Sequence, residues 1–173
     1  MGAQEQGADA TTGRWIVIPR TLCFVLNGDA VLLLKRAPHK RVFPNRYNGV
    51  GGHIERDEDP ISSARREILE ETGLSVDDLR LRAVYNIDAG EPTGILLFVF
   101  TAISDSREVT ANGEGTLHWI GHQDILQYDL VEDLPIILPR VLAMSADDPP
   151  LFIHLSYDER DVMRFRVAGE TDE

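Results

Sequence analysis

The residues best suited to chemistry are three glutamates in the stretch RREILEETGL, residues 65–74. Glu67, Glu70 and Glu71 are spaced i, i+3 and i+4, so a helix places their carboxylates on one face, where like charges repel by roughly a few tenths of a kcal/mol per pair. Carboxylate oxygens are hard ligands of the kind that Mg²⁺ prefers, and a divalent cation relieves the repulsion. The spacing therefore admits two interpretations, a cation-binding face or an acidic helix exposed to solvent.

The residues around these glutamates follow a fixed spacing. Gly52 is followed by five residues and Glu58, then by seven residues and Arg66, and the segment closes with Gly73 and Leu74. The pattern resembles the Nudix box, Gly-x5-Glu-x7-Arg-Glu-U-x-Glu-Glu-x-Gly-U with U aliphatic, and nine specified positions match over 23 residues. This resemblance favours the cation-binding face over the exposed acidic helix.

The resemblance implies a ligand set and a cofactor. In the family pattern Glu67, Glu70 and Glu71 bind the metal, helped by a backbone carbonyl at Gly51 or Gly52. The implied cofactor is Mg²⁺, which keeps several waters and accepts phosphate oxygens from the substrate, and Mn²⁺ is expected to substitute for it. The glycines also allow the backbone to approach the metal and the phosphates closely.

The resemblance also implies hydrolysis of a nucleoside diphosphate linked to another group. Arg66 is expected to orient Glu58 through a charge-assisted pairing, and a carboxylate is expected to take a proton from the attacking water. The candidates for this base are Glu67, Glu70 and a glutamate outside the box. Glu114 lies five residues before a tryptophan in EGTLHW, where it is either an additional metal ligand or a solvated loop residue.

A second resemblance concerns the base of the nucleotide. The segment RYNGVGGHIE is similar to the MutT-like branch that hydrolyses oxidised purine nucleoside triphosphates such as 8-oxo-dGTP. By this resemblance Asn48 reads the purine, as do Glu132 and Asp133 ahead of the second helix. The branch carries a tryptophan before the acidic pair, whereas this chain has Leu130 and Val131. The structural alternatives are a turn residue for Asn48 and a helix cap for the acidic pair.

Cationic residues near the box are candidates for binding the phosphates. Lys35 and Arg36 end an apolar run, and each is either a triphosphate ligand or a solvated surface charge. Gly52 is expected to bring backbone against the substrate.

These observations support three functional hypotheses. The first is a Mg²⁺-dependent Nudix hydrolase that cleaves a nucleoside triphosphate, such as 8-oxo-dGTP, to a monophosphate and pyrophosphate. The second is a Nudix pyrophosphatase for ADP-ribose or another nucleoside diphosphate conjugate. The third is a non-catalytic nucleotide-sensing module, which the intact set of box residues disfavours.

The element that must position the glutamates is a helix from Pro60 to Thr72. Asp59 is a favourable N-cap ahead of a proline at the first helical position, and Gly73 supplies the stop. The apolar stripe expected to pack against a sheet consists of Ile61, Ala64 and Ile68. By the helical period this stripe is rotated roughly 100° from the glutamates, so we expect the carboxylates to face a cleft.

The rest of the chain reads as strands with one further helix. Two β-rich runs flank Asn27-Gly28, a dipeptide that favours a tight hairpin, and strand character is expected over Val50 to Ile54. Further strands are expected at 79–87, 94–103 and 116–120, a helix at 135–144, and a final strand pair in LFIHLSY and DVMRFRV. The pattern predicts an α/β fold, which the resemblance specifies as a Nudix-type α/β/α sandwich with a mixed β-sheet between helices.

Composition limits the partners and the compartment. The 173 residues carry a formal net charge of -12, which opposes binding to nucleic acid polymers and to anionic membranes and leaves a small-molecule nucleotide as the partner. Cys23 is the single cysteine, and the start of the chain has neither a basic nor an apolar signal region, so we expect a cytoplasmic protein. We expect a disordered lead-in over 1–13, one hydrolase domain over 14–167 and an acidic tail over 168–173. The sequence does not distinguish a monomer from a homodimer.

Overall fold

The computed structural model describes residues 2–8, 12–110 and 113–170. Within them, eight strands form one mixed sheet in the order β3-β2-β1-β5-β4-β7-β8, and β6 pairs with the other edge of β2. Strand pairs β1–β5 and β4–β7 are parallel, and the remaining pairs are antiparallel. The elements are η1 (Ala3–Gln6), β1 (Ile16–Asn27), β2 (Ala30–Arg36), β3 (Tyr47–Asn48), α1 (Pro60–Thr72), β4 (Asp77–Asp88), β5 (Thr93–Ile103), β6 (Gly115–Gly121), η2 (His122–Gln127), α2 (Leu134–Ala143), β7 (Leu151–Tyr157) and β8 (Met163–Val167).

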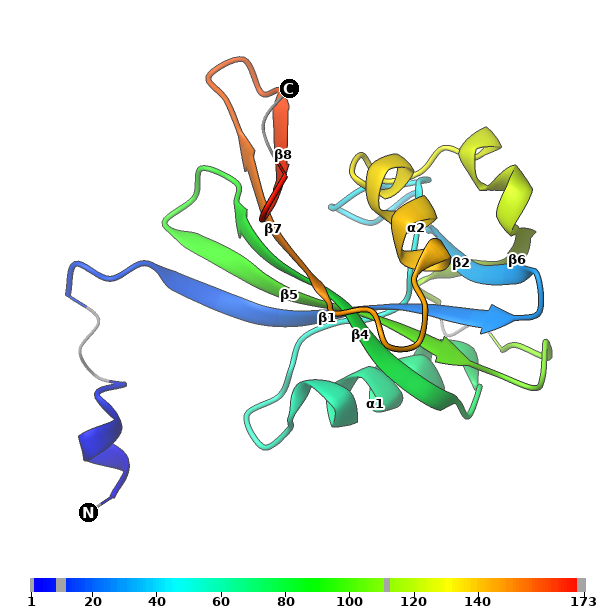
Figure 1. The fold of residues 1–173 in the computed structure, drawn as a ribbon, viewed down its shortest axis with the longest axis horizontal. Helices are drawn as coiled ribbons and strands as arrows, with labels where there is room; N and C mark the ends of the chain where they lie inside the picture. The colour runs from blue at the N-terminus through cyan, green and yellow to red at the C-terminus, as the bar shows by residue number, and fades with distance from the viewer. Residues whose placement is uncertain (1, 9–11, 111–112, 171–173) are drawn as a thin grey trace.

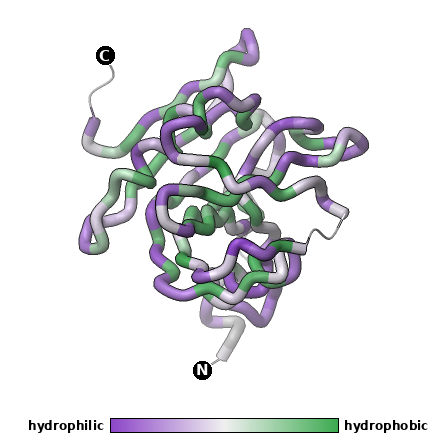
Figure 2. The backbone as a smooth tube through the Cα atoms, turned by 90° about the vertical axis from the view of Figure 1, so that its right-hand side faces the viewer, coloured by the Kyte–Doolittle hydropathy of each residue, from purple (hydrophilic) through white to green (hydrophobic). Residues whose placement is uncertain are grey.

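Helices α1 and α2 lie on opposite faces of this sheet (Figure 1), as the α/β/α sandwich requires. One core lies under α1, where Ala64 and Ile68 pack with Cys23 and Phe100. A second core joins α2 to the other face. Figure 2 shows the hydrophobic stretches concentrated toward the inside of the molecule, with hydrophilic segments in the outer loops. In the described part of the chain, no helix has the length and apolar character needed to cross a membrane.

The first helix has the bounds that its capping residues predict. The Asp59 carboxylate accepts hydrogen bonds from the backbone N–H groups of Ile61 and Ser62 at 2.8 and 3.0 Å. At the other end Gly73 adopts a φ of 76° and its N–H donates to the carbonyl of Leu69 at 2.9 Å. These local interactions satisfy backbone groups that the helix itself leaves unpaired.

The predicted apolar stripe of α1 is wrong at one position. Ala64 and Ile68 are fully buried, but Ile61 is 50% exposed. The buried face of the helix also includes Glu71 and Thr72. At 100° per residue Ile61 falls on the same side as Ile68 and Thr72, but it lies in the first turn, at the exposed end of the helix. The three glutamates therefore do not share one environment, because Glu71 is buried.

Two predictions for the strands need correction. The hairpin lies where expected and Gly28 has a φ of 63°, but Asn27 pairs with Ala30, so Gly28 and Asp29 form the turn. The segment from Val50 to Ile54 is not a strand and makes only isolated bridges to β1 in the described residues. The helix η2 was not predicted.

The predicted terminal segments are only partly described. Residues 3–6 of the expected lead-in form η1, whereas residues 1 and 9–11, and residues 171–173 of the expected tail, lie outside the described residues.

Candidate active site

The glycine-rich segment runs antiparallel beside β1 at very close range and brings backbone to the glutamate helix. The N–H of Thr21 donates to the carbonyl of Gly52 at 2.8 Å, and Cys23 and Val50 exchange backbone hydrogen bonds of 2.6 and 3.1 Å. A Cβ atom at Gly51 would overlap the Thr21 carbonyl, and one at Gly52 would overlap the carboxylate of Glu67. Glycine is therefore required here for close approach.

Arg66 is the centre of the carboxylate cluster. Its guanidinium binds both oxygens of Glu58, at 2.6 and 2.9 Å, and donates to Glu67 at 2.9 Å and Glu70 at 3.1 Å. It also donates to the carbonyl of His53 at 3.1 Å, which ties the helix to the loop. The hydrogen bonds from Arg66 lower the pKa of Glu58 to about 2, and the carboxylates raise the pKa of Arg66. The Arg66–Glu58 pair is therefore charged at neutral pH.

Glu71 occupies a different environment from its neighbours. It is 8% exposed and accepts a hydrogen bond from the N–H of Gly51 at 3.0 Å. Burial raises its pKa to about 7; the negative charges of Glu67 and Glu114 add to this shift, while the Gly51 hydrogen bond and Arg36 oppose it. A buried carboxyl group near two other carboxylates favours either a bound proton or a bound cation.

The structure also brings Glu114 toward the box. Its backbone carbonyl accepts from the N–H of Ala37 at 3.0 Å, and its carboxylate forms an ion pair with Lys40 at 2.5 Å. Since the charge of Glu114 raises the pKa of Glu71, the residue lies within electrostatic range of the site. The loop that carries Lys40 therefore holds Glu114 beside the cluster.

The two candidate phosphate ligands at the end of β2 differ in their contacts. The Lys35 ammonium lies over the ring of Tyr47, 5.7 Å from the centroid. Arg36 donates from Nε to the carbonyl of Val42 at 2.7 Å, while its charge acts on Glu71. The charge of Arg36 thus reaches the cluster, whereas Lys35 lies with Tyr47, which packs against the core on the α2 side of the sheet.

Backbone pairing brings the strand that carries Asn48 next to the segment that leads to Glu132 and Asp133. The N–H of Tyr47 donates to the carbonyl of Asp129 at 2.8 Å, and the N–H of Val131 donates to the carbonyl of Tyr47 at 3.0 Å. Asn48 therefore lies beside the segment that leads to the acidic pair. In this structure its amide oxygen accepts from the N–H of Gly49 at 2.8 Å, which is the turn contact that the structural alternative describes.

The acidic pair lies against two tyrosines that the sequence did not single out. Asp133 precedes α2 but its side chain makes no capping hydrogen bond. Burial raises its pKa, and the buried hydroxyl of Tyr85 beside it has its own pKa raised by burial and by the Asp133 charge. The Tyr157 hydroxyl donates to Glu132 across 3.5 Å, a long and weak contact. A tyrosine within an alternating strand carries no sequence signal that separates a pocket residue from a core residue.

The fit of a metal to this site rests on the type and position of its ligands. Within residues 2–8, 12–110 and 113–170, no three acidic, histidine or cysteine side chains are already gathered around a common point, because Arg66 holds Glu67 and Glu70. The candidate ligand atoms are nevertheless all hard oxygens, and the Glu67 carboxylate lies in the space over Gly52. The burial of Glu71 disfavours a negative charge there without a compensating cation. These residues fit a divalent cation such as Mg²⁺.

Comparisons with known proteins bear on the same region. Residues 18–141 match the NUDIX domain model. The nucleoside triphosphatase NudI of Escherichia fergusonii is 33% identical over 129 residues, which cover 68% of this chain and 88% of the relative. The MutT protein of Bacillus halodurans superposes with a TM-score of 0.75 at 25% identity, over 90% of this chain and 100% of that one. A NUDIX hydrolase from Nitrosomonas europaea superposes with a TM-score of 0.66 at 23% identity, over 80% and 77% of the two chains.

Proposed function

The chain belongs to the Nudix family, and from this premise we propose that it is a divalent-metal-dependent hydrolase that converts a nucleoside triphosphate into a monophosphate and pyrophosphate. The observation that carries the proposal is the Arg66 cluster, in which one guanidinium holds Glu58, Glu67 and Glu70 beside the glycine-rich backbone. A binding module needs no such array of charged groups. The resemblance to a protein called a nucleoside triphosphatase supports the triphosphate class.

The cofactor that fits these ligands is Mg²⁺, with Mn²⁺ as a substitute. The residues that would hold it are Glu67, Glu70 and Glu71, with the Gly51 carbonyl and Glu114 as further oxygen donors. When bound, such an ion supplies charge stabilisation at phosphoryl oxygens and a polarised water.

The protein side chains have separate tasks in this proposal. Arg66 fixes Glu58 by a bidentate contact, and this contact anchors the loop against α1. Glu67 and Glu70 are the candidates for accepting the proton of the attacking water. Gly52 leaves the space in which the Glu67 carboxylate lies, so the backbone sets the position of that group.

We propose an oxidised purine nucleotide such as 8-oxo-dGTP as the substrate within this class. Asn48 lies beside the segment that leads to Glu132 and Asp133, and the three residues offer an amide and two carboxyl groups, which can match donors and acceptors on one purine edge. Lys35 and Arg36 are the proposed cationic partners of the phosphates, which the action of the Arg36 charge on Glu71 supports for Arg36, and Gly52 would allow close approach.

The proposed setting is a single hydrolase domain over 14–167, acting in the cytoplasm on small-molecule nucleotides. The charge of -12 accords with the exclusion of polymeric nucleic acids.

A substrate panel with Mg²⁺ tests the proposal. The panel contains dGTP, 8-oxo-dGTP, the other nucleoside triphosphates and ADP-ribose, and pyrophosphate and orthophosphate are measured separately. We expect pyrophosphate release with 8-oxo-dGTP preferred over dGTP by at least about tenfold, which corresponds to about 1.4 kcal/mol. If ADP-ribose is the best substrate, the protein is instead a pyrophosphatase of nucleoside diphosphate conjugates. If the preference for 8-oxo-dGTP over dGTP is smaller than this, the oxidised purine is not the substrate.

A further inference from the structure

A hollow lies away from the candidate active site, on the face of the sheet opposite to α2. On β4, Val84 and Asn86 alternate with the core residues Ala83 and Tyr85, which pack toward α2. The strands of this region extend beyond α1 (Figure 1), and Phe152 is 57% exposed. We call this hollow the Phe152 pocket; it has a volume of about 280 Å³ and is lined by Val84, Asn86, Leu96, Phe152, Ile153, His154, Arg166 and Ala168.

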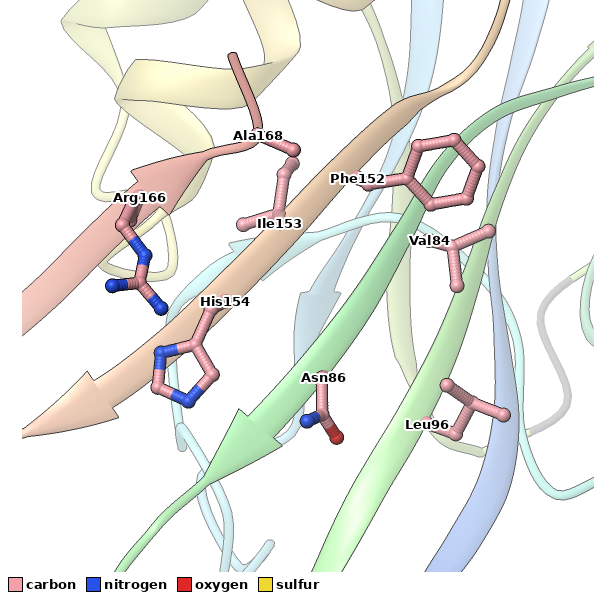
Figure 3. Close-up of a pocket in the computed structure, with 8 residues that line it drawn as sticks. All are labelled: Val84, Asn86, Leu96, Phe152, Ile153, His154, Arg166 and Ala168. Carbon is pink, nitrogen blue, oxygen red and sulfur yellow. The ribbon is translucent and has the colours of Figure 1, made fainter. Parts of the chain in front are cut away.

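The register of the strands divides the Phe152 pocket into a polar and an apolar row. Asn86 pairs with His154 across β4 and β7, and His154 pairs with Arg166 across β7 and β8. The amide, the imidazole and the guanidinium therefore lie in one line over three strands (Figure 3). In the neighbouring row Val84 pairs with Phe152, which gives the pocket an apolar wall. A mostly apolar lining with a few convergent polar groups is typical of small-ligand sites.

The charge of the pocket contrasts with that of the chain. The chain carries -12 overall, yet no aspartate or glutamate of the described residues lines the pocket. Arg164, two residues away on the same strand, pairs with Asp158 at 2.7 Å. The guanidinium of Arg166, by contrast, forms no ion pair or side-chain hydrogen bond in the described part of the chain. A planar fork of donors without such a partner, in a pocket that also holds an exposed aromatic ring, is complementary to an oxyanion attached to a flat apolar group.

We propose that the Phe152 pocket binds a small aromatic anion, either a carboxylate or a phosphate monoester. Arg166 binds the oxyanion, His154 and Asn86 supply further polar contacts, and the ring of the ligand lies against Phe152, Val84 and Leu96. None of these residues belongs to the Arg66 cluster or to the base-reading set. The proposal therefore does not depend on the hydrolase activity.

An NMR titration of the metal-free protein tests this proposal, with phenyl phosphate and benzoate as the two probes. We expect saturable shifts of the amide signals of residues 84–86, 152–154 and 166–168, and a comparison of the probes decides between phosphate and carboxylate. Inorganic phosphate and benzyl alcohol, which lack the ring and the charge respectively, are expected to bind at least about fivefold more weakly.

Two variants and a matched control separate the parts of the site. Arg166→Gln is expected to weaken both aromatic anions at least about fivefold, and Phe152→Leu is expected to erase the difference between phenyl phosphate and inorganic phosphate. Arg164→Gln is the control, because it removes an exposed charge from the same strand. Dispersed spectra of all three variants establish folding. The proposal is overturned if neither probe saturates, if Arg164→Gln weakens binding as much as Arg166→Gln, or if the shifts fall instead on residues 51–71.

Discussion

Replacing Gly52 by alanine isolates the placement of one carboxylate from the stability of the fold. The Cβ atom that this substitution adds would overlap the Glu67 carboxylate, which is the movable end of a side chain, so we expect Glu67 to shift by about 1 Å. A misplacement of this size costs roughly 100-fold in kcat/KM, or about 2.7 kcal/mol of transition-state stabilisation. Loss of the Arg66–Glu67 contact costs about 1 kcal/mol of folding stability, and the reduced freedom of the unfolded chain offsets part of it.

Gly51→Ala is the matched control for this prediction. Its Cβ would overlap the backbone of Thr21, and Gly51 has a φ of 150°, so the fold itself must distort, at a cost of about 3 kcal/mol or more. Urea denaturation measures both stabilities, and pyrophosphate release from dGTP measures turnover. In a Glu67→Gln background, Gly52→Ala should cause little further loss of activity. The reasoning is refuted if Gly52→Ala keeps kcat/KM within about threefold of the wild type, or if it destabilises the protein as much as Gly51→Ala does.

Three further predictions concern charge. Arg66 lowers the pKa of Glu58 from 4.5 to about 2, so the stabilisation that the Arg66–Glu58 pair gives is present above pH 4.5 and is lost as the pH falls toward 2. The Tm difference between the wild type and Arg66→Gln should therefore narrow over that range. A Tm difference that stays constant would contradict the pairing. Burial raises the pKa of Asp133 from 3.8, so the wild type loses stability as the pH rises through the raised value. Asp133→Asn should therefore be more stable than the wild type in urea at pH 7, with a smaller difference in stability at pH 4. The same variant should lose purine selectivity. Mg²⁺ at 100 times its Kd should stabilise the wild type by about 2.7 kcal/mol. The same concentration of Mg²⁺ should stabilise Glu71→Gln by less, as measured by calorimetric scans. Equal stabilisation of the two proteins would show that Glu71 is not a metal ligand.

The extent of α1 could be predicted because its ends are determined locally. Asp59, Pro60 and Gly73 act on backbone groups a few residues away, and such capping is readable in a sequence. The prediction that Ile61 is buried was wrong because the part of a helix that a sheet covers depends on distant residues, and Ile61 lies in the exposed first turn. The segment after Val50 was wrong for a similar reason, since its path is set by contacts with β1 and Glu67.

The site shows the same division between local and distant information. The spacing of the box predicts which residues form the Arg66 cluster, because one loop and one helix supply all of them. It does not predict that Glu71 is buried, which depends on how α1 packs. The proximity of Tyr85 to Asp133 joins two segments that are far apart in the chain, and neither residue type alone indicates it.

The central claim is that the Arg66 cluster is a metal-dependent centre for cleaving nucleoside triphosphates. The most direct test is ³¹P NMR of the products formed from dGTP by the wild type and by Glu70→Gln, each with Mg²⁺ and with a chelator. We expect equal amounts of monophosphate and pyrophosphate from the wild type with Mg²⁺, and no products from Glu70→Gln or in the presence of chelator. Orthophosphate as the first product, or turnover by Glu70→Gln close to that of the wild type, would contradict the claim.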